Sequence, residues 1–472
     1  MAGVFFTAGE AKKRAGVYQR YEKTGAAAFA GASNGIVAAI ISCNWGEINK
    51  VVEIETVAQV AEHFGTSGNT FVIEEAIKGG ASLVRVVRVG NESGSKATAT
   101  LNDTDSTPAI AVTAKHMGTR AFSYAVRNVI GDSTAMEFVL LDAGKIIEKI
   151  QFLTEGGVAN LINAAKSSKY MDFALVGEYS ATGKKLAATG EVLMTAGTNP
   201  TVTNTDYSTA LTALEPHRWN TLCVDSNDVA VHALVSAYMT RVYQNGKTGM
   251  AVLGEPISQP LATRMDHAAA FNDYKVVYVG GGWYDTSDNL IDGFRAAARI
   301  AGMIAYIPAN QSITHNVIST ASRPAEMLTN SQFEQSIDKG MITFAQSPSG
   351  NVWIESGINT LVALTGEDDE GWKKIKRTKI RFEVMDRVND SVAPLIGTIN
   401  NDEDGRATVI QTVKGVLNAM VAEKKLMAGA SVEVDPSNAP VGDSAWFVIV
   451  ADDIDSLEKV YFTYKFRFAS NS

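Results

Sequence analysis

The chain has 472 residues, of which 46% are apolar and 20% are charged, and this composition is that of a folded protein with more than one hydrophobic core. Its net charge of −9 predicts no broad basic surface, which argues against binding to nucleic acid or to anionic membranes. Two cysteines, Cys43 and Cys223, exclude a disulfide framework and a multi-thiol metal site.

Residues 1–25 are expected to form an N-terminal arm. They are rich in small residues and locally basic, with a short strand-like piece at 16–19. Their charges follow a very short apolar stretch, which is the wrong order for a signal peptide. No later segment reaches the roughly 18 apolar residues that span a bilayer. We therefore expect the protein to be made in the cytoplasm and not to insert into a membrane.

Residues 26–90 predict a compact unit of two strands and two helices. The continuous apolar run at 35–42 is typical of a buried strand. Thr56 and Gln59 form a capping box that begins a helix, and Gly65 is placed to end it. The βααβ order is completed by two further elements, a helix at 71–78 and a strand at 82–87.

The middle of the chain predicts two different kinds of sheet. Residues 91–183 begin with a polar stretch and continue with short β-prone pieces, which is typical of an inserted β-sandwich. Residues 184–366 alternate strands with helices, which predicts a parallel sheet with helical crossovers. In this second region we expect strands at 220–224, 250–253 and 275–279, and helices that begin near Asp228, Ser258 and Asn289.

Residues 367–458 predict a C-terminal α+β unit. An acidic run at 367–370 and a basic run at 373–381 precede an amphipathic helix over 384–396. The longest helix is expected after Asp402, because apolar residues then recur at helical spacing. A strand is expected at 446–450.

The last segment, 459–472, has an apolar face although it stands at the end of the chain and is expected to form a C-terminal arm. Side chains alternate along a strand, and alternate residues from Val460 to Phe468 are apolar. Chain ends are normally polar. This face is therefore expected to be buried, either in the sheet of its own chain or in that of a neighbour.

The search for catalytic, cofactor and metal motifs is negative. The sequence has no nucleophile elbow, zinc-binding helix, P-loop or dinucleotide fingerprint. The glycines at 280–282 predict a tight turn rather than a phosphate loop, because the next helix starts too late. Asp225 and His267 could form a triad with Ser312 or Ser319, but the spacing gives no support.

The basic run at 373–381 leaves two interpretations open. Its charges could be a solvated face balanced by the adjacent acids, or they could form a surface for an acidic protein partner.

Five stretches occur in an order that extends over nearly the whole chain: A-G-V-Y at 15–18, E-H-F-G at 62–65, A-I-K-G-G-A at 76–81 with V-R-V at 84–86, L-I-G-T-I-N-N at 395–401 and D-S-L-E-K-V-Y at 455–461. In this combination the chain resembles the contractile tail sheath proteins of phages and phage-tail-like bacteriocins, in particular those of Gram-positive bacteria. The family usually has proline where this chain has Ala15, and alanine makes the arm less rigid.

The resemblance implies a mixed α+β multidomain fold. It comprises an N-terminal unit, an inserted β-sandwich, a subtilisin-like α/β domain without the protease triad, and a C-terminal α+β domain with exchanged terminal strands. With the boundaries found above, the units are 1–25, 26–90, 91–183, 184–366, 367–458 and 459–472.

The resemblance also implies a structural subunit, not an enzyme, that uses no cofactor. Such subunits form hexameric rings stacked helically around an inner tail tube, with baseplate and tail terminator proteins as further partners. Contraction drives the tube through a target cell envelope, and the mature location is a virion tail or a bacteriocin particle. Two alternatives stay open, a degenerate α/β hydrolase-like enzyme and another structural component of a tail.

Two sets of residues are candidates for contact with other molecules. Strand addition between subunits would hold a lattice together while it rearranges, and the candidates for the exchanged strands are Val17, Tyr18, Tyr21, Val460, Phe462, Tyr464, Phe466 and Phe468. The candidates for a surface that faces the inner tube are Lys373, Lys374, Lys376, Arg377, Lys379, Lys414, Lys424 and Lys425. The inserted domain is expected to face outward.

Overall fold

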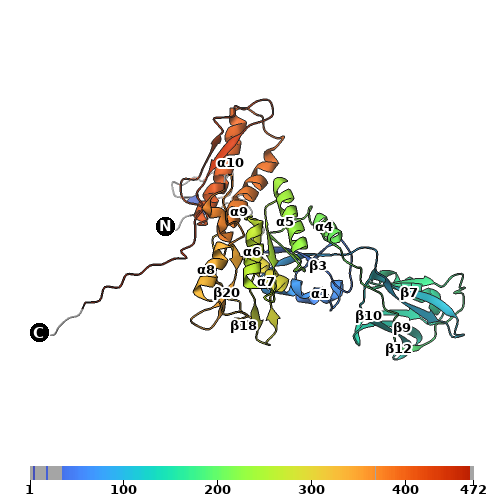
Figure 1. Ribbon diagram of the computed structural model, residues 1–472. Helices are drawn as coiled ribbons and strands as arrows, with labels where there is room; N and C mark the ends of the chain where they lie inside the picture. The colour runs from blue at the N-terminus through green and yellow to red at the C-terminus, as the bar shows by residue number, and fades with distance from the viewer. Residues whose placement is uncertain (1–3, 6–17, 20–34, 367, 468–472) are drawn as a thin grey trace.

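A seven-stranded sheet occupies the centre of the molecule (Figure 1). The structure is a computed structural model that describes residues 4–5, 18–19, 35–366 and 368–467. The strand order is β19-β15-β14-β13-β3-β5-β4, and all neighbours are parallel except β4 and β5. The strands are β3 (Ile36–Ile41), β4 (Val51–Ile54), β5 (Leu83–Arg88), β13 (Thr221–Val224), β14 (Met250–Gly254), β15 (Val276–Val279) and β19 (Met341–Ile342).

The sheet joins two segments that the sequence placed in separate units. β3 from the 26–90 segment pairs with β13 from the 184–366 segment, with Val37 opposite Thr221. The predicted separation of these units is therefore wrong, and β4 was not predicted. The pairing cannot be seen in chain order, because the whole inserted domain lies between its two strands.

Helices cover both faces of this sheet. α1 (Val57–Phe64), α2 (Phe71–Lys78) and α7 (Gly293–Tyr306) pack on one face, where they share a core with Val37 and Ile41. α4 (Asn204–Ala213), α5 (Val229–Gln244) and α6 (Leu261–Phe271) pack on the other face. The predicted capping box of Thr56 and Gln59 is confirmed at the start of α1.

Short elements complete this body. α6 and α7 begin a few residues later than predicted, and α8 lies before β19. The bounds are α8 (Asn330–Asp338), β16 (Trp283–Asp285), β17 (Leu290–Ile291), β18 (Ala321–Pro324), β20 (Phe344–Gln346) and β21 (Val352–Ile354).

The inserted domain is two antiparallel sheets around one core, at the end of the molecule away from α10 (Figure 1). Their orders are β10-β9-β8-β12 and β11-β7-β6. β12 extends the insertion beyond the predicted end at residue 183, and the helix α3 was not predicted. The elements are β6 (Lys96–Asn102), β7 (Pro108–Met117), β8 (Phe122–Val129), β9 (Asp132–Asp142), β10 (Lys145–Leu153), α3 (Gly157–Ala164), β11 (Met171–Leu175) and β12 (Thr189–Leu193).

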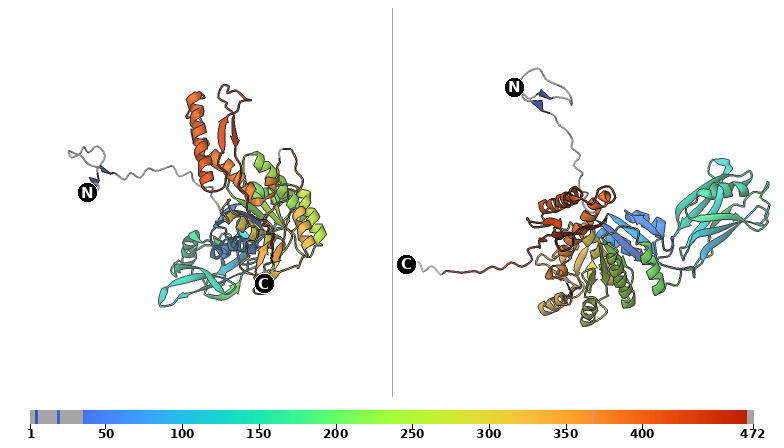
Figure 2. Two further views of the ribbon diagram at one scale, coloured as in Figure 1. Left: turned by 90° about the vertical axis from the view of Figure 1, so that its left-hand side faces the viewer. Right: turned by 90° about the horizontal axis from the view of Figure 1, so that it is seen from above.

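The C-terminal part is a pair of helices and a hairpin that project from the body (Figure 2). Its elements are a 3-10 helix (Glu370–Lys373), α9 (Ile375–Val392), a 3-10 helix (Ala393–Leu395), α10 (Glu403–Ala422), β22 (Ser431–Val434) and β23 (Phe447–Val450). α9 begins nine residues before the predicted helix and contains most of the basic run. α10 begins just after Asp402, as predicted, and Asp402 caps the helix by accepting a hydrogen bond from the Gly405 nitrogen at 2.8 Å.

The two predicted arms are described only in part. Tyr18 lies in β2 (Tyr18–Gln19), which pairs with β1 (Val4–Phe5) of the same chain, while Val17, Tyr21 and Phe468 lie outside the described residues. Residues 459–467 run away from the body as an extended segment (Figure 2). Among the described residues no helix is long and apolar enough to cross a membrane.

Candidate functional site

An open groove lies between α9, α10 and the β22–β23 hairpin. Its volume is about 1260 Å³. The small core beneath it includes Ile380, Val416 and Leu417. The groove is lined mainly by apolar side chains, among them Val384, Met385, Val388, Val392, Ile396, Val409, Val432, Phe447 and Ile449.

Residues on α9 leave part of an apolar stripe uncovered. Val384, Val388 and Val392 recur every four residues and so lie on one face of the helix, where each is half-buried. Met385 is 42% exposed and Ile396, just beyond the helix, is 73% exposed. A soluble protein normally covers such a surface, so the groove is a site where another segment can bind.

The hairpin that forms one wall of the groove has unpaired strand edges. Within the described part of the chain, β22 and β23 pair only with each other, with Val432 opposite Ile449. The outer backbone groups of each strand therefore remain available to a further strand. An added strand would extend the hairpin over the apolar surface of the helices.

The C-terminal arm has the apolar face that the alternation of its sequence predicts. Val460 is 56% exposed, Phe462 73%, Tyr464 74% and Phe466 93%. The aromatic rings of Phe462, Tyr464 and Phe466 follow one another at centroid separations of 6.3 and 6.1 Å, which places them on the same side of the segment. This stripe is covered by no other part of the described chain.

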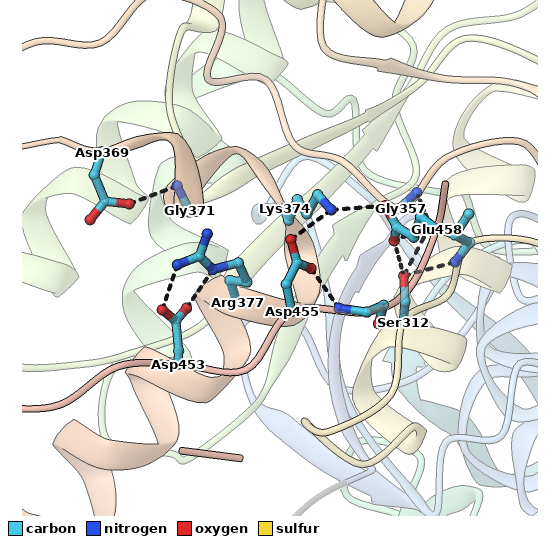
Figure 3. A network of polar contacts seen from close by, with 11 residues as sticks. Ser312, Gly357, Asp369, Gly371, Lys374, Arg377, Asp453, Asp455 and Glu458 are labelled. Atoms are coloured by element: carbon cyan, nitrogen blue, oxygen red, sulfur yellow. Dashed lines mark hydrogen bonds and ion pairs between the residues drawn. The ribbon is translucent and has the colours of Figure 1, made fainter. Parts of the chain in front are cut away.

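The basic run is paired with acids that precede the arm. Arg377 forms two hydrogen bonds with Asp453, at 2.7 and 2.8 Å, and Lys374 contacts Asp455 and Glu458 at 2.8 and 2.9 Å (Figure 3). Burial alone would raise the pKa of Asp453, but hydrogen bonds from Arg377 and Arg381 keep it below its usual value. The sequence predicted balance by adjacent acids, whereas most of the partners lie more than 70 residues away.

Three of the residues proposed to face the tube are not on an open surface. Lys376 and Lys425 are 5% and 6% exposed. Lys379 donates to the carbonyl oxygens of Ile304 and Ile307 at the end of α7, and burial lowers its pKa to about 7.

These three lysines are therefore no longer candidates for the tube-facing surface, because each is packed inside its own chain. Lys374 and Arg377 are engaged in the pairs above, and Lys373 pairs with Glu370. Lys414 and Lys424, on and just after α10, are exposed.

The residues considered for catalysis are held apart in separate contacts. Asp225 accepts hydrogen bonds from Ser42, Asn69 and Tyr207. His267 contacts Glu255 at 3.0 Å, and Ser312 donates to Glu458. No triad is assembled among the described residues, and no group of metal-ligating side chains occurs there.

The glycines at 280–282 serve packing. A Cβ atom at Gly280 would lie 2.0 Å from the Met341 sulfur on β19, and one at Gly282 would lie 2.6 Å from the Ile291 carbonyl oxygen. At Gly282 the contact is with backbone, and only glycine allows this close approach.

Two protein-family models match the chain. The model for the phage tail sheath protein central domain matches residues 201–360, and the model for the tail sheath protein Gp18 domain III N-terminal region matches residues 34–89. Together these segments contain all seven strands of the central sheet. The chain belongs to the phage tail sheath protein family. The resemblance seen in the sequence is confirmed, and the family is one of structural proteins rather than enzymes.

Relatives of this tail sheath protein match nearly all of the chain or more than half of it. It is 24% identical to the phage-like element PBSX protein XkdK of Bacillus subtilis, over 98% of this chain and 99% of that protein. It is 22% identical to the tail sheath protein of Clostridium phage phiCD119, over 58% of this chain and 71% of that protein.

Solved structures share the fold of this tail sheath protein. The sheath tail protein of Desulfitobacterium hafniense gives a TM-score of 0.72 at 22% identity, over 93% of this chain and 100% of that one. A subunit of the anti-feeding prophage helical sheath in the contracted state gives 0.56 at 9% identity, over 96% and 99%. The mixed α+β multidomain fold is thus that of tail sheath structures.

Proposed function

We propose that this sheath protein polymerises helically around an inner tube, and that the C-terminal arm of each copy completes the groove of a neighbouring copy. The observation that carries the proposal is the pairing of two incomplete surfaces in one chain. One is the apolar groove beside a two-stranded hairpin, and the other is an exposed strand-like segment with one apolar face.

The dimensions of the two surfaces support this docking. Residues 460–466 span roughly 23 Å when extended at about 3.3 Å per residue, and β22 and β23 have four residues each. The arm is thus long enough to pair along a whole strand of the hairpin. Its alternate side chains would then lie over the stripe on α9.

Burial of the apolar face of the arm is a favourable contribution to assembly. Each large apolar side chain removed from water contributes about 1.5–3 kcal/mol, and the arm carries four, at Val460, Phe462, Tyr464 and Phe466. Ordering the arm costs about 1–2 kcal/mol per residue in backbone entropy, which backbone hydrogen bonds and groove contacts must offset. Contacts of this head-to-tail kind continue from copy to copy and produce a helical filament when they do not close.

Contraction, on this proposal, needs no cofactor. The energy would come from burying more surface between copies in the contracted lattice than in the extended one, while the exchanged strands keep neighbours connected. The likeness to a subunit of a contracted helical sheath supports a lattice of this kind.

The further partners follow from the same proposal. A chain of similar fold occurs in the solved structure of the anti-feeding prophage baseplate in the contracted state. We propose an inner tail tube protein, baseplate proteins and a tail terminator as the partners of this chain, in hexameric rings, within a phage or phage-like tail particle. For the tube-facing surface, the exposed Lys414 on α10 and Lys424 just after it are the remaining candidates.

Deletion of residues 459–472 tests the proposal. We expect the purified full chain to form hollow striated cylinders in negative-stain images, and the truncated chain to stay a folded subunit at the same concentration. A matched control replaces residues 459–472 by a Gly/Ser sequence of equal length, which keeps the length but removes the apolar face. Normal cylinders from either variant would contradict the exchange of this strand.

A further inference from the structure

The segment just before the C-terminal arm is fixed to its own body by a cluster of ion pairs. Asp453 accepts two hydrogen bonds from Arg377, at 2.7 and 2.8 Å, and two longer ones from Arg381. The Asp453 side chain is only 7% exposed. Two-point arginine–carboxylate contacts shielded from water are among the stronger polar interactions in proteins.

Glu458 is the last contact of this segment, and it reaches two other parts of the molecule (Figure 3). Its carboxylate accepts from Lys374 of α9 at 2.9 Å. It also accepts from Ser312 at 3.1 Å and from Thr314 at 3.0 Å, in the loop that follows α7. Thr314 in turn accepts from the Gly357 nitrogen at 2.9 Å. Glu458 thus lies where the central body and the C-terminal helices meet.

The backbone supports the same attachment. The Ile454 nitrogen donates to the Lys425 oxygen at 2.9 Å, and the Met427 nitrogen donates to the Asp452 oxygen at 2.8 Å. These contacts end at Glu458. None of residues 459–467 makes a hydrogen bond or ion pair with the described part of the chain, and all of them are exposed.

We propose that this arm anchor, formed by Asp453, Asp455 and Glu458 with their partners on α9 and in the 312–314 loop, makes Glu458 the last residue that moves with its own body. The flexible connection to a neighbouring copy then begins at Lys459. The inference rests on the proposed function, in which the arm is held by another subunit.

The anchor has two consequences for an assembled sheath. A pull on the arm is delivered to the junction of the central body and α9 instead of to the β22–β23 hairpin, which must hold a neighbour's arm. It also fixes the length of the connection. Release of residues 451–458 would add roughly 26 Å of slack at about 3.3 Å per extended residue, and the spacing between copies would no longer be defined.

Spin labels on the unassembled full chain test the anchor directly. Leu457→Cys places a label at a side chain that is 85% exposed, inside the anchor, and Tyr464→Cys places one on the arm. Thr408→Cys on α10 gives a rigid exposed reference. The native Cys43 and Cys223 are buried, so they do not compete for the label. We expect slow motion at 457, as at 408, and fast motion at 464.

The decisive variants remove the Glu458 contacts. Two variants are made, the single change Lys374→Glu and the triple change Ser312→Ala, Thr314→Val and Glu458→Ala. In either variant we expect the label at 457 to show the fast motion seen at 464, and the label at 408 to be unchanged. Lys459→Ala, one residue beyond the anchor, is the matched control and should change nothing. Combining Lys374→Glu with Glu458→Lys should restore slow motion at 457.

Fast motion at 457 in the native protein, or slow motion in both sets of variants, would overturn the anchor. These measurements need no polymer, so their failure is distinct from that of the strand exchange, which the truncation at 459 tests. The unchanged label at 408 reports that the variant is folded. In assembled cylinders the same variants should broaden the distribution of axial repeats, and an unbroadened repeat would contradict the mechanical role.

Discussion

The central sheet and the C-terminal hairpin differ in how completely the chain covers their apolar side chains. Strand β3 is buried at every position from Ile36 to Ile41, because helices cover both faces of its sheet. On β23, Ile449 is 37% exposed and Val450 56%. The first region is complete within one chain, whereas the second has unpaired edges and a groove. A protein that must join others can leave one apolar surface open only if another core already holds it folded.

The largest expected effect is on stability, and it separates the two regions. Ile300→Ala in α7 removes a fully buried side chain, and such changes cost about 2–5 kcal/mol. Ile396→Ala, at the groove, is expected to cost less than about 0.5 kcal/mol, as surface changes usually do. Thermal and denaturant unfolding of the subunit measures both. Equal losses would mean that the groove is part of the subunit's own core.

The second effect is on assembly, and we expect it from changes at the groove, which should leave stability unchanged. Met385→Glu and Ile396→Glu place a charge where the neighbour's arm would lie, and burying an unpaired charge is costly. We expect cylinders to be lost while the subunit unfolds as before. Met327→Glu, at a side chain that is 77% exposed and outside the groove, is the matched control. Cylinders from both groove variants would contradict the proposed role of the groove in assembly.

The same contrast explains what the sequence could predict. Local signals were sufficient for α1 and α10, because the capping side chains of Thr56 and Asp402 lie within a few residues of the groups they bind. The alternation from Val460 to Phe466 likewise predicted the apolar face of the arm. These features depend on neighbours in the chain.

Features that depend on distant residues could not be predicted from the sequence. The pairing of β3 with β13 brings together segments more than 180 residues apart, and no local pattern specifies it. The basic run of α9 predicted either a solvated face balanced by adjacent acids or a surface for a partner, because its actual partners Asp453, Asp455 and Glu458 follow much later in the chain. The acidic residues just before the arm were the only available signal. Charge alone did not distinguish an internal contact from a surface for a partner.

A third prediction concerns acid, and it sharpens the contrast between the anchored segment and the arm. The folded pKa of Asp453 is lowered by Arg377 and Arg381, so its contribution to stability is fully present above its unfolded value of about 3.8. It is lost as the pH falls through the lower folded value. Asp455, on the same segment, contacts Lys374, and Asp369 also pairs with Arg381.

We therefore expect a spin label at 457 to stay slow down to about pH 4 and to become mobile below it, while a label at 464 is fast throughout. The pKa of Lys374 is affected by burial, which lowers it, but more by Asp455 and Glu458, which together raise it. Its contribution is present below about pH 10.5 and is lost only above that. Release near neutral pH would show that other groups control the attachment.

The smallest expected effect on the subunit comes from its exposed charges. Lys414→Glu and Lys424→Glu change side chains that lie on the outside of the C-terminal part, so the melting temperature should not move measurably. If α10 faces the tube, both changes should reduce co-sedimentation of the sheath protein with inner tubes prepared from the same particle. The loss should be partly masked at high salt, since exposed charges are screened.

Lys50→Glu is the control for charge alone, because Lys50 is exposed on the central body and pairs only with Glu47 three residues away in the described structure. It alters the net charge by the same amount at a different place. If it weakens binding to tubes as much as the α10 variants do, general repulsion explains the loss and the tube-facing surface lies elsewhere. If only the α10 variants weaken binding, the C-terminal part carries both connections of the subunit, to its neighbours through the groove and to the tube through the outer side of α10.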